Sequence, residues 1–302
     1  MKKFVETTFS RYTSKVISTN LIYKEKLVLQ TIPFYVLNGI GPIIHFAHAN
    51  AYPPRSYQQM LIQLSRDYYI EAMHLRPLWP NSQPEEMVSW DVVADDLIRF
   101  FEQQGLTQVI GIGHSLGAVG TMYAALKRPD LLRALVLIEP VFLPPNLLQM
   151  AAANPVAAEN MPFVQVARRR RYQWPDRQAA FEHFRSKKVF ARWSDEILWD
   201  YVRAGLCDSA DGGVTLVYSR EWEARFYGRP PLTVWEDIPH ITQPTLAIRG
   251  SESDTLFPDA WQLWQELQPE ATFVEMSGVG HMLPMERPLP LAQQIHEFIQ
   301  NL

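Results

Sequence analysis

A serine flanked by glycines, placed directly after an apolar run, constrains this chain more than any other feature. Residues 111–118 read Gly-Ile-Gly-His-Ser-Leu-Gly-Ala and follow the stretch 107–110, Thr-Gln-Val-Ile. The Gly-x-Ser-x-Gly pattern is typical of an abrupt turn from a buried strand into a helix, in which the strained central residue points its side chain away from the sheet. Residues 118–127 are compatible with the helix that such a turn requires. The pattern predicts Ser115 as a nucleophile.

Length and composition favour one domain with an insertion. The chain has 302 residues, 47% of them hydrophobic, so it can bury a large core but is short for two full domains. A formal net charge of -4 gives no electrostatic reason to expect nucleic acid or an anionic membrane as a partner. We expect a small-molecule substrate, uncharged or apolar, and no nucleic acid. The sequence leaves the oligomeric state open, including a homodimer.

Cysteine content and hydropathy bear on the compartment. Cys207 is the only cysteine, so no intrachain disulfide can form. The chain has no apolar run of eighteen residues and no apolar core of a signal peptide. We expect a cytoplasmic protein without membrane insertion.

From about residue 26, apolar runs alternate with amphipathic ones, which predicts an α/β fold with a mostly parallel central sheet and helices on both faces. The first two strands are expected to form an antiparallel meander. The expected strands are Leu27–Leu29, Phe34–Leu37, Pro42–Ala47, Tyr69–His74, Gln108–Gly111, Ala134–Ile138, Thr245–Ile248 and Thr272–Glu275. The expected helices are Ser56–Ser65, Trp90–Gln104, Leu116–Lys127, Asp259–Leu267 and Leu289–Asn301.

The alternation stops between about residues 141 and 241. Pro-Pro pairs at 144/145 and 230/231 bracket a segment rich in aromatic residues and arginines. It follows the strand Ala134–Ile138 at the carboxyl edge of the sheet, where open α/β folds bind ligands. We therefore expect residues 141–241 to form a helical cap inserted into a core made of residues 1–140 and 242–302.

A serine hydroxyl needs a base to take its proton and a carboxylate to orient that base. His281 lies in the loop 276–284, Met-Ser-Gly-Val-Gly-His-Met-Leu-Pro, after an expected strand. Asp254 lies in the loop that follows the strand Thr245–Ile248. Both loops should open at the same edge of the sheet as Ser115. Glu252 is the alternative carboxylate in the same loop.

These three motifs, in the order Ser, Asp, His, resemble those of the α/β-hydrolase superfamily from about residue 26 onward. The carboxyl-terminal stretch 278–288, Gly-Val-Gly-His-Met-Leu-Pro-Met-Glu-Arg-Pro, strengthens the resemblance. It implies Ser115 as nucleophile, His281 as general base and then acid, and Asp254 as the orienting carboxylate. Asp254 stands four residues after Gly250, one more than the superfamily's common spacing.

An oxyanion hole requires two backbone N–H groups aimed at the developing charge. The first should belong to Leu116, directly after the nucleophile. The resemblance assigns the second to the turn after the strand Pro42–Ala47, at Asn50 or, as the alternative, Ala51. Ala49 replaces a glycine common in relatives, so this turn should depart somewhat from the superfamily's geometry.

Four residues are candidates for lining the substrate pocket: His48, His114, Trp174 and Trp222. For His48 the competing interpretation is a structural hydrogen bond, for His114 it is support of the site next to the serine, and for the tryptophans it is the core of the cap. Arg168–Arg171 would bind an anionic group or form a solvated helix face. His45-x-x-His48 does not predict a metal site, because residues three apart on a strand point to opposite faces.

The resemblance implies a serine hydrolase that cleaves a small to medium, largely apolar carboxylic ester through an acyl-enzyme, without a cofactor. The same residues would serve carbon–carbon bond hydrolysis, cofactor-free perhydrolysis, or thioester or lactone cleavage. Epoxide and haloalkane chemistry in this fold uses an aspartate nucleophile, which Ser115 argues against. A ligand receptor without turnover is a further alternative.

Overall fold

The described part of the chain is built around a single large sheet. The computed structural model describes residues 31–302, which form a seven-stranded sheet in the order β1-β3-β2-β4-β5-β9-β10. Its strands are β1 (Phe34–Leu37), β2 (Ile43–Ala47), β3 (Tyr69–Met73), β4 (Val109–His114), β5 (Leu132–Ile138), β9 (Thr245–Gly250) and β10 (Thr272–Met276). β1 is antiparallel to β3, and the remaining neighbours are parallel. The predicted mostly parallel sheet is confirmed, while the expected strand Leu27–Leu29 lies outside the described residues.

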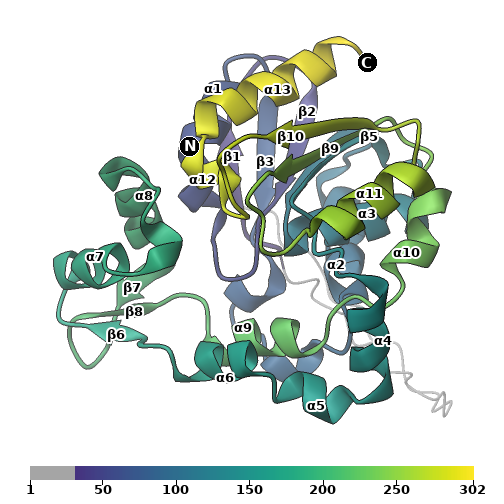
Figure 1. Cartoon of the computed structure of the whole chain (residues 1–302). Helices are drawn as coiled ribbons and strands as arrows, with labels where there is room; N and C mark the ends of the chain where they lie inside the picture. The colour runs from purple at the N-terminus through teal and green to yellow at the C-terminus, as the bar shows by residue number, and fades with distance from the viewer. Residues whose placement is uncertain (1–30) are drawn as a thin grey trace, which may run out of the picture. The chain divides into compact units, whose positions relative to one another are not determined.

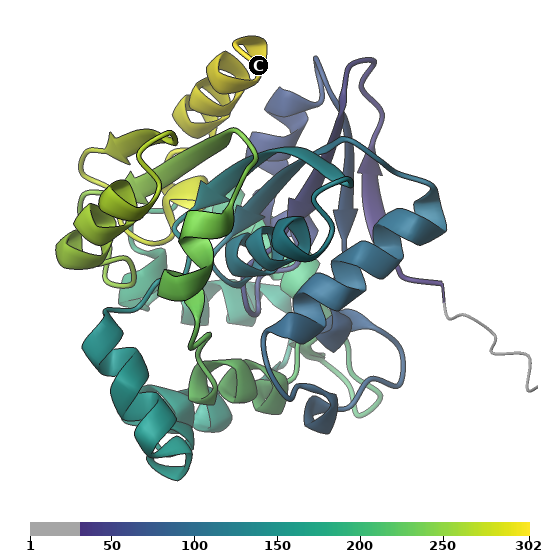
Figure 2. The same ribbon diagram turned by 90° about the vertical axis from the view of Figure 1, so that its right-hand side faces the viewer.

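Helices cover both faces of this sheet, as predicted (Figures 1 and 2). Side chains of α2, α3 and α11 share one apolar cluster, and those of α1, α12 and α13 share the cluster on the opposite face. The bounds of these helices are α1 (Gln58–Leu64), α2 (Asp91–Gln104), α3 (Leu116–Lys127), α11 (Pro258–Leu267), α12 (Leu283–Glu286) and α13 (Pro288–Gln300). A short 3-10 helix, η1 (Pro54–Tyr57), precedes α1.

The alternation of side chains along the central strands explains the two clusters. In β2, Ile44 and Phe46 pack on the α1 and α13 side, whereas Ala47 packs on the α2 and α3 side. Both faces of β4 are buried throughout, as expected for a parallel strand covered by helices on each side.

Residues 141–241, hereafter the inserted segment, lie between β5 and β9 in the sequence, although these two strands pair directly in the sheet. Its helices are α4 (Pro145–Ala153), α5 (Pro155–Glu159), α6 (Pro162–Arg169), α7 (Arg177–Arg185), α8 (Asp195–Gly205), α9 (Arg220–Gly228) and α10 (Val234–Asp237). It also contains an antiparallel sheet of β6 (Gln173–Trp174), β8 (Val214–Leu216) and β7 (Leu206–Asp208). The sequence analysis did not predict these strands, because two or three residues are too few to show an alternating pattern.

Local signals explain where several helices of the inserted segment begin. Pro145 and Pro162 stand at the first turn of α4 and α6, where a proline nitrogen replaces a donor that would have no partner in the helix. The side chains of Ser194 and Ser219 accept hydrogen bonds from first-turn amides of α8 and α9.

Two further features of the described residues concern the cysteine and the lengths of the helices. Cys207, in the middle of β7, is exposed and free. None of the helices within residues 31–302 combines the length and the apolar character needed to cross a bilayer.

A buried histidine in β2 should make folding stability depend on pH. His45 is completely buried, with its ring 5.1 Å from that of Phe101, and burial together with nearby His48 lowers its pKa to about 3. Below pH 6.5 the unfolded chain binds a proton here that the folded protein excludes, so stability should fall as the pH drops toward 3. At pH 5 this histidine should cost about 2 kcal/mol relative to pH 7.

Urea unfolding at pH 7 and pH 5 measures this difference. In the His45→Gln variant, the difference in unfolding free energy between pH 7 and pH 5 should be smaller by about 2 kcal/mol. The matched substitution His240→Gln, at an exposed position, should leave the difference unchanged. An unaltered pH dependence in His45→Gln would contradict the assignment.

Candidate active site

Ser115 occupies a strained turn between β4 and α3. Its φ is +55° and its ψ is -115°, a conformation that costs a non-glycine residue about 1–3 kcal/mol and persists only where the surroundings impose it. The flanking glycines show how it is imposed. A Cβ on Gly117 would lie 2.1 Å from the carbonyl oxygen of Ala47, and one on Gly113 would lie 2.4 Å from that of Gly117. The start of α3 therefore packs directly against the end of β2.

His281 lies between β10 and α12, beside Ser115. Its Nε2 is 3.0 Å from Ser115 Oγ, and its Nδ1 is 3.0 Å from Glu139 Oε2. In the arrangement that satisfies all three groups, the hydroxyl donates to Nε2 and Nδ1–H donates to the carboxylate. The structure thus brings together Ser115 and His281, as the sequence analysis expected, but with a different carboxylate.

Glu139 is that carboxylate, and the prediction that Asp254 orients His281 is wrong. Glu139 directly follows β5 with φ +48°, and its side chain is completely buried. Its Oε1 accepts from the amide of Gly250 at 2.6 Å, and its Oε2 accepts from Ser253 Oγ at 2.5 Å. The β9 loop therefore contributes groups that hold the carboxylate instead of the carboxylate itself.

The two acidic residues predicted in the β9 loop have other neighbours. Asp254 is exposed, and its carboxylate accepts a hydrogen bond from Thr255 Oγ1 at 3.4 Å. Glu252, the alternative acid, forms an ion pair with Arg192 of the inserted segment. A sequence signal for Glu139 existed: it is the first residue after an apolar strand, at the same sheet edge as Ser115.

The turn after β2 holds the predicted oxyanion donors. The amide of Ala49 donates to the hydroxyl of Tyr57 at 3.1 Å, and Ala51 interacts through its backbone with the hydroxyl of Tyr218. The amide of Asn50 has no backbone acceptor among residues 31–302. Within this turn Ala51 has a positive φ of +69°, whereas Ala49 does not. Asn50 and Leu116 thus remain the predicted donors, and Leu116 is the first residue of α3, whose amide has no partner within the helix.

The side chain of Asn50 is fixed by the inserted segment. Its Oδ1 accepts from the hydroxyl of Tyr218 at 2.8 Å, and its Nδ2 donates to the carbonyl oxygen of Glu223 at 3.1 Å. The inserted segment therefore helps to set the position of the turn that carries Asn50.

His48 makes two hydrogen bonds with the backbone, as its competing structural interpretation expects, and its contact with a substrate stays a prediction. It is fully buried, its Nδ1 donates to the carbonyl oxygen of Ala49 at 2.8 Å, and its Nε2 accepts from the amide of Leu75 at 3.1 Å. Burial lowers its pKa to about 3. His45 Nε2 likewise accepts from the amide of Met73 at 3.3 Å, so the two histidines are occupied by separate backbone groups.

His114 connects the two halves of the site. The Tyr57 hydroxyl donates to its Nδ1 at 2.8 Å, and its Nε2–H donates to the carbonyl oxygen of His281 at 2.9 Å. A continuous hydrogen-bonded path thus runs from the amide of Ala49 through Tyr57 and His114 to the backbone of His281. His114 is fully buried, which lowers its pKa well below the usual value. These two hydrogen bonds give His114 a positioning role, and its contact with a substrate stays a prediction.

The remaining predicted pocket residues lie within the packing of the inserted segment. Trp174 contacts the rings of His183 and Phe184, and Trp222 stacks on Phe226. Both tryptophans are almost fully buried. Their contact with a substrate stays a prediction.

Comparison with known proteins identifies the family of this chain. A family model described as the alpha/beta hydrolase family matches residues 46–294. The chain belongs to the alpha/beta hydrolase family.

Among relatives of this hydrolase, the 2-(acetamidomethylene)succinate hydrolase of Mesorhizobium japonicum is 24% identical over 268 residues, covering 86% of this chain and 89% of the relative. A crystal structure of E-2-(acetamidomethylene)succinate hydrolase superposes with a TM-score of 0.75 at 22% identity, covering 89% of this chain and 95% of that one. The thioesterase domain from the curacin biosynthetic pathway superposes with a TM-score of 0.72 at 18% identity, covering 88% and 99%. At these identities the superpositions show a shared fold.

Glu139 can be tested against both acidic residues of the β9 loop. Glu139→Gln should lower kcat for 4-nitrophenyl acetate on the order of 10³- to 10⁴-fold, because the carboxamide neither fixes the histidine tautomer nor stabilises its protonated form. Asp254→Asn and Glu252→Gln, which remove the same charge a few residues away, should change kcat less than about threefold. A larger loss of kcat in Asp254→Asn than in Glu139→Gln would instead support Asp254 as the carboxylate that orients His281.

The path through Tyr57 gives a second test. Tyr57→Phe removes the hydroxyl that joins Ala49 to His114 and leaves two buried polar groups without a partner, so it should destabilise the fold by about 1–3 kcal/mol in urea unfolding. Because both ends of the path belong to the reacting site, kcat should fall more than KM rises. Tyr172→Phe, at an exposed tyrosine, is the control, and equal effects of the two substitutions would refute the positioning role.

Proposed function

We propose that this protein is a serine hydrolase that cleaves a small to medium carboxylic ester through an acyl-enzyme. The observation that carries the proposal is the unbroken line of hydrogen bonds from Ser115 through His281 to Glu139, with both distances at the histidine equal to 3.0 Å. A hydroxyl, an imidazole and a buried carboxylate in this order are the parts that nucleophilic acyl transfer requires.

In the proposed reaction, Ser115 Oγ attacks the ester carbonyl while His281 Nε2 takes its proton. The histidine then gives this proton to the departing alkoxide, and the acyl group remains on the serine. A water molecule, deprotonated by the same nitrogen, attacks the acyl-enzyme and releases the carboxylic acid and free Ser115. Glu139 stabilises the positively charged imidazole in both halves.

The amides of Leu116 and Asn50 are the proposed oxyanion hole. They would hold the negative charge that develops on the carbonyl oxygen, an effect worth about 3–4 kcal/mol for each donor in enzymes of this kind. No step of this mechanism uses a metal or an organic cofactor. Residues 31–302 contain no group of three or more histidine, cysteine, aspartate or glutamate residues that could hold a metal ion.

We also propose that the inserted segment acts as a cap over Ser115, with residues 141–241 as its bounds. Its contacts with Asn50, and the ion pair of Arg192 with Glu252 at the rim, support this role. Substrate entry would then require movement about the proline-rich ends near Pro144 and Pro230.

Carbon–carbon bond hydrolysis or thioester cleavage on the same residues is the second candidate. The names of two similar proteins describe a hydrolase of a succinate derivative and a thioesterase domain. A receptor without turnover is disfavoured because all three reacting side chains are present and aligned. The exposed free thiol of Cys207 favours a reducing compartment, for which the cytoplasm is our proposal.

A fluorophosphonate probe tests the proposal most directly. The purified protein should be labelled on Ser115 and should hydrolyse 4-nitrophenyl esters with repeated turnover, since the probe and the esters use the same activated serine. Ser115→Ala should abolish labelling and reduce turnover by at least about 10³-fold. Ser253→Ala is less drastic because it removes only one donor to Glu139, so it should keep the labelling at a reduced rate.

Labelling without repeated turnover would favour the receptor. A folded protein that is neither labelled nor active on oxygen or sulfur esters would overturn the proposal.

A further inference from the structure

A buried polar cluster lies where the inserted segment meets the turn that carries Asn50. Arg170, directly after α6, has its Nη1 2.8 Å from Glu223 Oε2 of α9. The other groups that act electrostatically on Arg170 are the hydroxyls of Tyr201, Tyr52 and Tyr227. Burial lowers the pKa of Arg170, but these neighbours outweigh burial and the pKa is raised. The guanidinium therefore stays charged in this environment.

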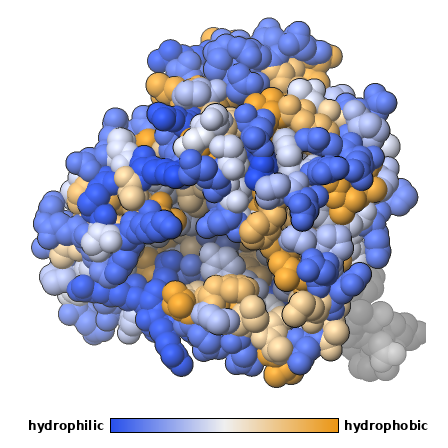
Figure 3. Space-filling model, viewed as in Figure 1, coloured by the Kyte–Doolittle hydropathy of each residue, from blue (hydrophilic) through white to orange (hydrophobic). Residues whose placement is uncertain are grey.

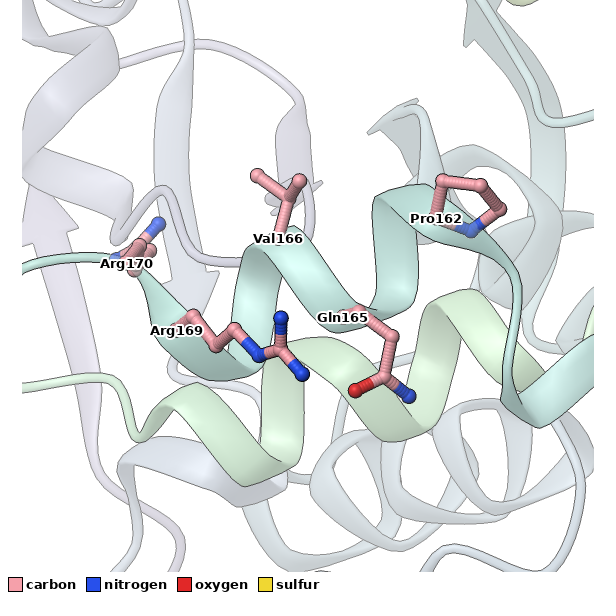
Figure 4. A pocket seen from close by; sticks show the side chains of 5 residues that line it. All are labelled: Pro162, Gln165, Val166, Arg169 and Arg170. Carbon is pink, nitrogen blue, oxygen red and sulfur yellow. The ribbon is translucent and has the colours of Figure 1, made fainter.

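Part of the Arg170 guanidinium is not used by the ion pair with Glu223. Its Nε and Nη2 are shielded from solvent, and neither has an acceptor in hydrogen-bond geometry among residues 31–302, although the hydroxyl of Tyr201 interacts with the guanidinium. Buried guanidinium N–H groups without partners are costly and uncommon, so they call for a physical explanation. The side chain as a whole is 24% exposed, because part of it lines a surface pocket of about 420 Å³ on the outside of α6 (Figure 4).

The neighbouring arginines behave differently. Figure 4 shows Arg169 extended sideways across the outside of α6, whereas Arg170 is seen nearly end-on. Arg169 is exposed, Arg168 pairs with Glu221 at 3.2 Å, and Arg171 donates to the carbonyl oxygen of Gln173 at 2.9 Å. Three of the four arginines thus fit the solvated-face interpretation of Arg168–Arg171, and Arg170 does not.

The cluster is tied directly to the proposed oxyanion hole. Glu223, the partner of Arg170, accepts through its backbone from the side chain of Asn50 at 3.1 Å. Tyr52 lies two residues beyond Asn50, and its ring is 5.2 Å from that of Tyr201. A single residue, Glu223, thus links Arg170 with the side chain of Asn50. Figure 3 shows the molecule hollowed on the face between the inserted segment and the core.

We propose that the free edge of Arg170 binds a carboxylate of the substrate, so that the ester cleaved at Ser115 is the monoester of a dicarboxylic acid. This inference rests on the proposed function and names its substrate class. Nε and Nη2 are the two parallel donors that receive both oxygens of a carboxylate in a bidentate pair. It replaces the expectation of a largely apolar substrate with one that carries a negative charge at the end of its acyl chain.

The charge of the cluster favours a single carboxylate. Burial raises the pKa of Glu223, although Arg170 opposes the shift. Arg170 carries a single positive charge, which a monoanionic carboxylate matches better than a dianionic phosphate does. Burial also raises the pKa of Tyr201 and Tyr227, which keeps their hydroxyls protonated and able to donate.

The test compares charged and neutral esters of the same length. Monoethyl succinate, glutarate and adipate are paired with ethyl butanoate, pentanoate and hexanoate, in which a methyl group replaces the carboxylate, and acid release is followed in a pH-stat. The wild type should prefer at least one half ester over its neutral partner in kcat/KM. Arg170→Gln should lower this preference on the order of 100-fold, the effect of losing two charge-assisted hydrogen bonds.

Matched variants separate recognition from folding. Arg169→Gln removes the same charge one residue away and should leave the preference unchanged. Arg170→Lys keeps the charge without the paired donors and should lose most of the preference, and Glu223→Gln should keep or increase it. Thermal unfolding monitors each variant, so that Arg170→Lys and Glu223→Gln decide the outcome if Arg170→Gln does not fold.

Binding to Ser115→Ala distinguishes failure of this inference from failure of the proposed function. Calorimetric titration with monoethyl glutarate should detect binding that Arg170→Gln, added to Ser115→Ala, weakens on the order of 100-fold. Ser115-dependent hydrolysis without preference for any half ester, and without this binding, would overturn the carboxylate site and leave the hydrolase intact. If the protein binds monoethyl glutarate, loses this binding on Arg170→Gln and shows no esterase turnover, the carboxylate site is supported and the proposed reaction is overturned.

Discussion

The contact between the first turn of α3 and the end of β2 is the constraint on which the site depends. It admits no side chain at residue 117, and it holds Ser115 in a backbone conformation that a serine does not adopt by preference. Several strained or close-packed positions gather around this contact: Ser115, Glu139 and Ala51 all have positive φ. These residues lie at the carboxyl ends of three parallel strands or in the turns directly after them. The sheet provides the rigidity that keeps them there.

The fold and two of the three reacting residues could be predicted from sequence because their signals are local. Parallel strands end at the same edge of a sheet. A glycine-bounded serine after one strand and a histidine in the loop after another are therefore predicted to lie close together. The third residue could not be chosen in this way. Three acidic residues, Glu139, Glu252 and Asp254, follow strands that end at the same edge, and the choice among them depends on burial and loop path. Ser253 and Gly250 turn their polar groups toward Glu139, and a sequence shows neither contact.

The inserted segment illustrates a different limit of sequence reasoning. Its flanking proline pairs, aromatic residues and arginines predicted a helix-rich insertion, and helices α4 to α10 lie within it. Which arginine differs from its neighbours depends on the direction of each side chain where α6 ends. Arg170 points into the contact with α9, and its partner Glu223 also holds Asn50. The proposed carboxylate site and the proposed oxyanion turn therefore both contact α9 through Glu223.

The position of Glu139 has a consequence for how the protein can diversify. Because the carboxylate comes from β5, next to the nucleophile strand, the outer part of the β9 loop carries none of the reacting groups. Its inner positions, Gly250 and Ser253, hold the carboxylate of Glu139, whereas Glu252 and Asp254 are exposed. Substitution at these two exposed positions removes neither hydrogen bond to Glu139, so the outer part of the loop can vary while the carboxylate stays in place.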